Sequence, residues 1–211
     1  MKNKIFLLFV IICQSSFLFS QEDWKLAKDK DGISVYTRKE GDNKFKAFRA
    51  EVTAKTSVQN FVATLQDIDL FSEWGHNIDR AKLLKREGEA LQIYYSVAKV
   101  SFPYKNRDGI YLNRFNWNSE TKTLKVDIEI LSDYLELNEK YTRVKGYGHW
   151  IVKEIPSNKI EIIFYMQIDP GGNIPSWLAN NFVDNSPYFT LLNLKNILEN
   201  NKTDKKFDFI D

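Results

Sequence analysis

The chain has 211 residues, of which 43% are hydrophobic and 27% are charged, and this is enough for one globular domain with a sizeable core. The formal net charge is only +2, and acidic residues are interleaved with lysine and arginine throughout the sequence. Because nucleic-acid binding normally requires a clustered excess of basic residues, this composition excludes nucleic acid as a partner.

Residues 1–20 differ in composition from the rest of the chain. Lys2 and Lys4 precede an apolar run, residues 5–12, and the segment closes with Ser20. This pattern predicts a secretory signal peptide cleaved after Ser20, and therefore a secreted or periplasmic protein. The apolar run is about half of the roughly 20 residues that span a bilayer, which argues against a membrane anchor.

Removal of this segment would also change the chemistry available to the mature chain. The formal charge would fall from +2 to zero, because Lys2 and Lys4 leave and no acidic residue leaves with them. Cys13 is the only cysteine in the sequence. We therefore expect a mature protein without disulfides, thiol catalysis or cysteine-ligated zinc.

The first part of the mature chain has the pattern of a hairpin followed by a helix. An Asp-Gly turn at residues 31–32 precedes an alternating strand, and residues 41–43 form a turn before its partner strand at 45–52. Thr56 or Ser57 is expected to cap a helix. One face of that helix is apolar and consists of Val58, Phe61, Val62 and Leu65. A short helical piece is predicted at residues 69–74.

From residue 81 onward the hydrophobic pattern has period two, which is typical of strands. The predicted strands are residues 81–85, 90–102, 109–116, 124–131, 146–155 and 160–168. Strands separated by short turns in this way indicate one long, curved antiparallel sheet. In the last strand, alternation places Phe164 and Met166 on the inward face.

Residues 169–198 join a sharp turn to a long apolar helix. The Asp-Pro-Gly-Gly sequence at 169–172 ends the preceding strand, and Pro175 is suited to the first helical turn. The apolar surface of the helix is too broad for a helix lying lightly on a surface, and it includes Trp177, Leu178, Phe182, Phe189 and Leu192. Pro187 is expected to kink or split the helix near Asn185. We interpret this helix as a lid.

Three features taken together resemble the START domain, the lipid-transfer module related to steroidogenic acute regulatory protein. They are the Arg107-Asp108 pair, the segment RVKGYGHW at 143–150, and a D-x-x-G-x-x-P-like turn at 169–175 followed by a long helix. The resemblance implies an α+β helix-grip fold in which a curved antiparallel sheet wraps a long C-terminal helix and leaves a hydrophobic cavity. It covers residues 24–200. We therefore expect a START-like lipid-binding domain at 21–201 and a tail at 202–211 that no pattern places.

Several residues are expected to contact a ligand in such a cavity. Arg107 and Asp108 match a pair found in START domains, and either pin a turn as an ion pair or lie at the ligand head group. Tyr95 and Lys99 share one side of their strand, which faces inward unless a bulge reverses the alternation. The full set of predicted ligand-binding residues is Tyr95, Lys99, Arg107, Asp108, Trp150, Phe164, Met166, Trp177, Leu178 and Phe182.

Catalytic and metal-binding patterns do not emerge from the sequence. His76 and His149 are the only histidines, and neither has an acidic or histidine neighbour at ligand spacing. The sequence has no G-x-S-x-G motif and no phosphate-binding glycine loop. We expect no catalytic residues, no metal and no cofactor.

The leading hypothesis is a monomer that binds one hydrophobic ligand, a lipid, without converting it. The C-terminal helix would gate the cavity, and transient membrane contact would accompany transfer. One alternative is an enzyme similar to the aromatase and cyclase proteins that share the helix-grip fold. Another is an interaction protein whose groove holds a peptide.

Overall fold

The computed structural model describes residues 23–41 and 43–210, apart from the side chains of residues 176, 177, 181 and 182. The predicted signal peptide therefore lies outside the described residues. In chain order the elements are β1 (Lys25–Lys30), β2 (Ile33–Arg38), β3 (Ala47–Ala54), α1 (Val58–Gln66), α2 (Phe71–Trp74), β4 (Ile78–Glu87), β5 (Leu91–Ala98), β6 (Arg107–Asn118), β7 (Thr123–Ile130), β8 (Thr142–Arg143), β9 (Lys145–Ile155), β10 (Lys159–Asp169) and α3 (Ser176–Asn200).

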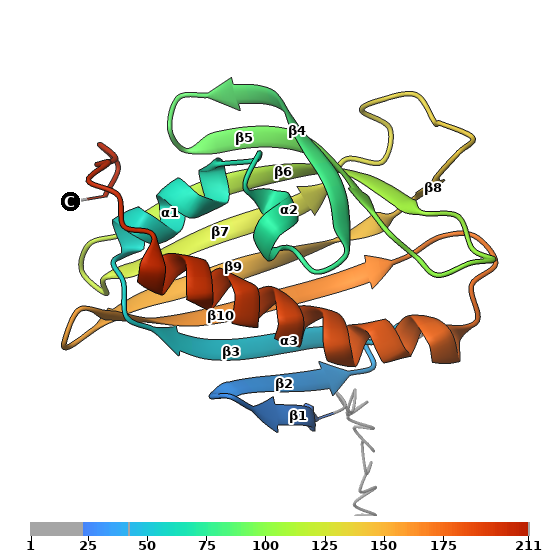
Figure 1. Cartoon of the computed structure of the whole chain (residues 1–211), viewed down its shortest axis with the longest axis horizontal. Helices are drawn as coiled ribbons and strands as arrows, with labels where there is room; N and C mark the ends of the chain where they lie inside the picture. The colour runs from blue at the N-terminus through green and yellow to red at the C-terminus, as the bar shows by residue number, and fades with distance from the viewer. Residues whose placement is uncertain (1–22, 42, 211) are drawn as a thin grey trace, which may run out of the picture.

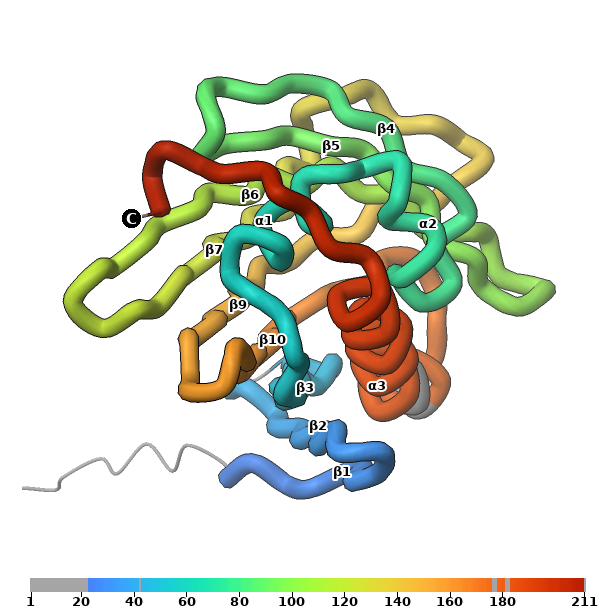
Figure 2. The backbone as a smooth tube through the Cα atoms, turned by 60° about the vertical axis from the view of Figure 1, so that its left-hand side comes forward, coloured from blue at the N-terminus to red at the C-terminus, as the bar shows by residue number. Residues whose placement is uncertain are grey.

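One sheet organises the molecule, with strand order β1-β2-β3-β10-β9-β7-β6-β5-β4, antiparallel along this path, while the short β8 pairs in parallel with β6. All three helices lie on one side of the sheet (Figure 1). Figure 2 shows the sheet curving around them. This arrangement is the α+β helix-grip fold that the sequence predicts.

Local sequence explains the ends of the elements. Asp31 and Gly32 form the turn between β1 and β2 with positive φ angles of 56° and 71°, a conformation that glycine adopts readily. Ser57 caps α1, because its hydroxyl accepts from the main-chain N–H of Asn60 at 3.2 Å. Both turn and cap are as predicted. The sequence did not predict β1 as a separate strand, because its residues are almost all exposed and show no apolar alternation.

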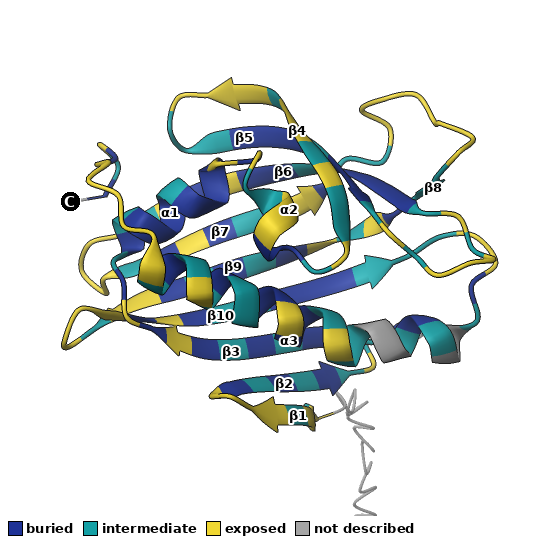
Figure 3. Cartoon of the chain, in the orientation of Figure 1, coloured by how far each residue is buried: buried dark blue, intermediate teal, exposed yellow. Residues whose placement is uncertain are grey.

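The two edge strands, β1 and β4, are largely exposed, and several of their side chains are lysine or arginine (Figure 3). Charged side chains of this kind discourage a second sheet from pairing with the edge. The central strands instead bury one face beneath the helices. The largest core cluster joins this face to α1 and α3 and includes Phe61, Trp150, Ile162, Leu191, Leu194 and Leu198.

Helix α3 runs from Ser176 to Asn200 without interruption at Pro187. Of the two outcomes predicted for Pro187, a kink or a split near Asn185, the split is therefore wrong. Proline at 187 removes one intrahelical hydrogen bond, but Tyr188 and Leu191, which follow it, are 4% and 0% exposed and hold the helix against the core. The packing of the apolar face outweighs the loss of one backbone bond.

The C-terminal tail folds back onto the body of the protein. Phe207 is 2% exposed and its main-chain N–H donates to Gln59 Oε1 at 3.1 Å, while Gln59 Nε2 donates to the carbonyl of Ile210 at 3.2 Å. These contacts join the tail to α1. Through Phe207 and Ile210 the tail, which no sequence pattern placed, therefore joins the core, while residues 202–206 stay exposed.

Candidate functional site

Two adjoining cavities lie between the concave face of the sheet and α3. The first, of about 190 Å³, is called the central cavity, and the second, of about 200 Å³ and nearer the β10–α3 turn, is called the loop-side cavity. They share the wall residues Phe48, His76, Ala98, Tyr111, Met166, Ile168 and Ser186. Depressions of about 610 Å³ elsewhere on the molecule are more polar and more open, so we take the paired cavities as the candidate site.

Aromatic side chains form a large part of the wall of the central cavity. Trp150 and Phe164, on the neighbouring strands β9 and β10, stack with ring centroids 3.7 Å apart and an interplanar angle of 3°. Met166 lies beside them. Gly148 faces Met166 across the strand pair, and a Cβ there would lie 2.1 Å from the Met166 sulfur. The glycine therefore makes room for the methionine in the cavity floor.

Trp150, Phe164 and Met166 thus line the cavity, on the face that alternation indicated. Leu178 does not, because it packs with Phe45 and Tyr104 in a separate cluster at the N-terminal end of α3. The side chains of two further predicted ligand-binding residues, Trp177 and Phe182, lie outside the described residues.

Arg107 borders the loop-side cavity, but its guanidinium is occupied by the main chain. Nε donates to the carbonyl of Pro170 at 3.1 Å, Nη1 to Lys105 at 2.5 Å and Nη2 to Gly171 at 3.2 Å. Gly171 and the following glycine both have φ of +65°, which a side chain would strain. Arg107 therefore fixes the turn that leads into α3, and burial lowers its pKa.

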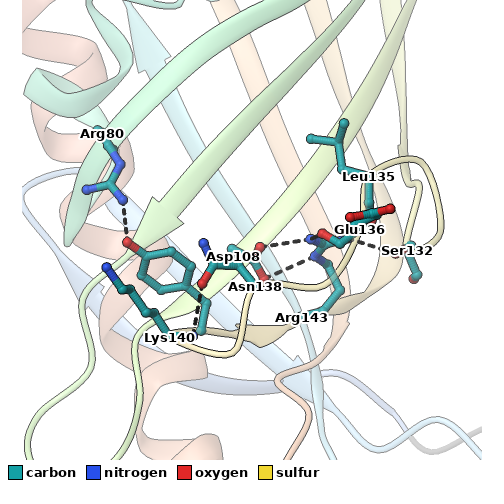
Figure 4. Close-up of polar contacts among 9 residues, drawn as sticks. Arg80, Asp108, Ser132, Leu135, Glu136, Asn138, Lys140 and Arg143 are labelled. Carbon is teal, nitrogen blue, oxygen red and sulfur yellow. Dashed lines mark hydrogen bonds and ion pairs between the residues drawn. The ribbon is translucent and has the colours of Figure 1, made fainter.

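Asp108 lies on the opposite face of the sheet, so its predicted ligand contact is wrong. Consecutive strand residues point to opposite faces, and Asp108 therefore pairs with Arg143 on the convex side (Figure 4). Nη1 of Arg143 also donates to the carbonyls of Ser132 and Leu135. The Arg107-Asp108 pair is thus not an ion pair, and each residue fixes a different loop.

Tyr95 differs from its predicted inward position, whereas Lys99 lies at the edge of the candidate site. Tyr95 packs on the convex face beside Ile93 and Ile110, where burial and Asp108 raise its pKa to about 12. Lys99 follows the end of β5, and its exposed side chain pairs with Asp79 at 3.0 Å at the rim of the loop-side cavity. Alternation alone does not identify the inward face of β5, because the apolar cluster of Ile93, Ile110 and Leu112 on the convex side makes the strand apolar on both faces.

Tyr94, not Tyr95, faces the central cavity, together with Trp74, His76 and Asn113. Asn113 could have been found from the sequence, because it alternates with the cavity residue Tyr111 on β6. Sequence periodicity offered no such signal for Trp74 and His76, which lie in and beside the short α2. Burial lowers the pKa of His76.

The described part of the chain contains neither a membrane-spanning helix nor a metal-binding group. No helix there is both long and apolar enough to cross a membrane. Residues 23–41 and 43–210 also contain no group of three or more histidine, cysteine, aspartate or glutamate side chains arranged to hold a metal ion.

Comparisons with known proteins agree with this architecture. The START domain model matches residues 14–204. A protein of uncharacterized function from Pseudomonas aeruginosa is 33% identical over 179 residues, covering 84% of this chain and 88% of that protein. Human phosphatidylcholine transfer protein is 30% identical over 165 residues, covering 75% of each chain. The crystal structure of a STAR-related lipid transfer protein from Xanthomonas axonopodis superposes with a TM-score of 0.78 at 32% identity, covering 84% of this chain and 99% of that one. The chain therefore belongs to the START domain family.

Proposed function

We propose that this protein binds one hydrophobic ligand of the lipid class in the paired cavities and carries it without chemical conversion. The observation that carries the proposal is the aromatic and aliphatic wall of the central cavity, in which Trp150, Phe164 and Met166 meet α3. Burying ligand carbon against such a wall contributes about 0.8 kcal/mol per methylene. The relatives named as lipid transfer proteins support the same class of ligand.

Cavity size supports a gating role for α3. The two cavities that form the proposed site, of about 190 and 200 Å³, together reach only the lower end of the roughly 300–1,000 Å³ typical of ligand pockets. A lipid larger than this space would therefore enter only if the walls separate. Ser186 and Pro187 of α3 border the central cavity, so displacement of this part of the helix would widen it.

The two ends of α3 are held differently, which determines where it opens. At the C-terminal end Leu194 and Leu198 are 0% exposed, and Asn60 Nδ2 donates to the carbonyls of Leu198 at 3.1 Å and Asn201 at 2.9 Å. The N-terminal end rests on the small cluster of Phe45, Ile174 and Ala179. We infer that the N-terminal half moves while the C-terminal half stays in place.

Membrane contact and compartment complete the proposal. Phe102 is 95% exposed in the loop between β5 and β6, and would insert into a bilayer surface during transfer. It lies two residues after Val100, which borders the loop-side cavity. Replacing Phe102 by serine should reduce sedimentation with phospholipid vesicles, and unchanged sedimentation would contradict this contact.

A secreted or periplasmic location is tested by sequencing the N-terminus of the exported protein, which should begin at Gln21 and not at Met1.

Organic extraction of the purified protein, followed by mass spectrometry, tests the function itself. Recovery of an intact lipid at about one molecule per chain is the expected result. A chemically modified aromatic product would instead indicate an enzyme of the aromatase or cyclase kind. A protein that stays empty after exposure to lipid vesicles would favour a peptide-binding groove.

A further inference from the structure

Two polar atoms in residues that line the central cavity have no hydrogen-bond partner among the described residues. They are the indole Nε1 of Trp74 and the side-chain oxygen of Asn113. Trp74 is 5% exposed and Asn113 is 3% exposed, so neither atom reaches bulk water. Buried polar groups are nearly always hydrogen-bonded, and an unpaired donor and an unpaired acceptor in one wall therefore point to a missing polar partner.

Aromatic side chains connect the surroundings of Trp74 with those of Asn113. Trp74 comes from α2 and packs against Phe71, with ring centroids 4.5 Å apart, and Phe71 in turn packs against Tyr94 at 5.7 Å. The side-chain amide of Asn113, on β6, acts on Tyr94 as well, and it partly offsets the rise that burial causes in the pKa of that phenol. The amide oxygen of Asn113 is the atom that has no partner in the described part of the chain.

The central cavity is also uncharged. No lysine, arginine, aspartate or glutamate occurs among its described lining residues. Burial raises the pKa of Tyr111 to about 12 and raises that of Tyr94 further, so both phenols are neutral at pH 7. Burial also lowers the pKa of His76, which favours its neutral form. A charged ligand group placed here would lose its hydration without gaining a counter-ion.

We propose that the ligand places an uncharged hydroxyl group in the central cavity, where it accepts a hydrogen bond from Trp74 Nε1 and donates one to Asn113. A hydroxyl is both donor and acceptor, and it satisfies the amide of Asn113 in either orientation. An ether or ester oxygen accepts only, and a carboxylate carries charge. The inference rests on the proposed function, and it narrows the ligand to an alcohol-bearing lipid.

Three probes with the same chain length test this choice: 1-tetradecanol, its methyl ether 1-methoxytetradecane, and tetradecanoate. Each competes with Nile red prebound to the purified wild-type protein. We expect the alcohol to bind at least about tenfold more tightly than the ether, since the ether lacks the donor for Asn113. Tetradecanoate should not bind more tightly than the alcohol.

Two variants and a matched control locate the effect. Trp74→Phe and Asn113→Leu should each bring the alcohol-to-ether affinity ratio close to one while leaving ether affinity within about threefold of wild type. Trp150→Phe shrinks an indole in the same wall and keeps the Trp74 N–H, so its ratio should remain that of wild type. An equal loss in all three variants would contradict recognition by Trp74 and Asn113.

Failure of this inference and failure of the proposed function give different results. If the alcohol and the ether displace Nile red equally, or tetradecanoate binds most tightly, the hydroxyl proposal is overturned and the cavity remains a lipid site. If Nile red does not bind, or none of the three probes displaces it, the proposed function itself fails.

Discussion

The side chains of Asp108 and Arg143 form a bidentate ion pair on the convex face of the sheet. Arg143 Nε and Nη2 donate to the two carboxylate oxygens of Asp108 at 3.0 and 2.9 Å, and the side chains are only 2% and 6% exposed. Removal of one partner would leave the other charge buried and unpaired. The pair therefore holds the β7–β8 loop to the sheet, away from the cavity.

Asp108→Ala should lower the free energy of unfolding by about 3–5 kcal/mol, because it leaves the buried Arg143 guanidinium without its carboxylate partner. Denaturant unfolding measures the loss. The exposed pair between Arg114 and Glu129 provides a matched control, since its side chains are 48% and 53% exposed. Glu129→Gln should cost less than about 1 kcal/mol. Reduced ligand affinity in folded Asp108→Ala protein would show that the convex face takes part in binding.

Met166→Lys should abolish lipid uptake and destabilise the fold, because Met166 is 4% exposed and borders both cavities. Glu161→Lys, on the exposed face of the same strand, is the control and should change neither property. Uptake is measured by the transfer of a fluorescent lipid from vesicles, and stability by thermal melting. Normal uptake by a normally stable Met166→Lys protein would mean that the cavity is not the binding site.

Crosslinks at the two ends of α3 test which end opens. The main-chain N–H of Lys46 donates to Asn180 Oδ1 at 3.1 Å, and that of Lys55 donates to Glu199 Oε1 at 2.9 Å. In a Cys13→Ser background, paired cysteines at 46 and 180 should stop lipid exchange when oxidised and restore it when reduced.

Paired cysteines at 55 and 199 should leave the exchange rate unchanged, because that end of α3 stays packed against the core. Exchange that stays fast with the first pair oxidised, or stops with the second pair oxidised, would refute opening at the N-terminal half. Mass measurement of the intact protein confirms that each disulfide has formed.

Acidification should weaken both stability and binding through His76. Burial lowers its folded-state pKa below the usual value of about 6.5, so the unfolded chain binds more protons as the pH falls. The stabilisation is therefore complete above about pH 6.5 and is lost as the pH falls through the folded pKa. His76→Gln should reduce the pH dependence of unfolding and of ligand affinity between pH 7.5 and about 5.

His149 separates the two effects. Burial lowers its pKa as well, but it stacks on Tyr165 on the outer face of the sheet. His149→Gln should therefore alter the pH dependence of unfolding and leave that of ligand affinity as in wild type. An affinity profile that His76→Gln leaves unchanged would remove this histidine from the site.

Local patterns in the sequence predicted much of this fold. The Asp31-Gly32 turn, the Ser57 cap and the inward face of β10 follow from turn chemistry, capping and period-two burial, all of which depend on neighbouring residues. The family resemblance supplied the curved sheet and its long helix.

Long-range partners could not be predicted in the same way. Arg107 binds the carbonyl of Pro170, and Asp108 binds Arg143, across separations that no local pattern encodes. Tyr95 was assigned to the wrong face because apolar residues cover both sides of β5. Trp74 joins the cavity wall from a four-residue helix, α2, which is too short to show a periodic face.

Filling the cavity from α3 tests the central claim most directly. Ser186 borders both cavities, and Ser186→Phe would occupy the space that we assign to the ligand, whereas Asn196→Phe adds the same ring at an exposed position of the same helix. The measurement is the number of lipid molecules per folded chain, by native mass spectrometry after incubation with phospholipid vesicles containing 1-tetradecanol. We expect one ligand in the wild type and in Asn196→Phe, and none in Ser186→Phe with melting retained. One ligand per chain in well-folded Ser186→Phe would contradict the account.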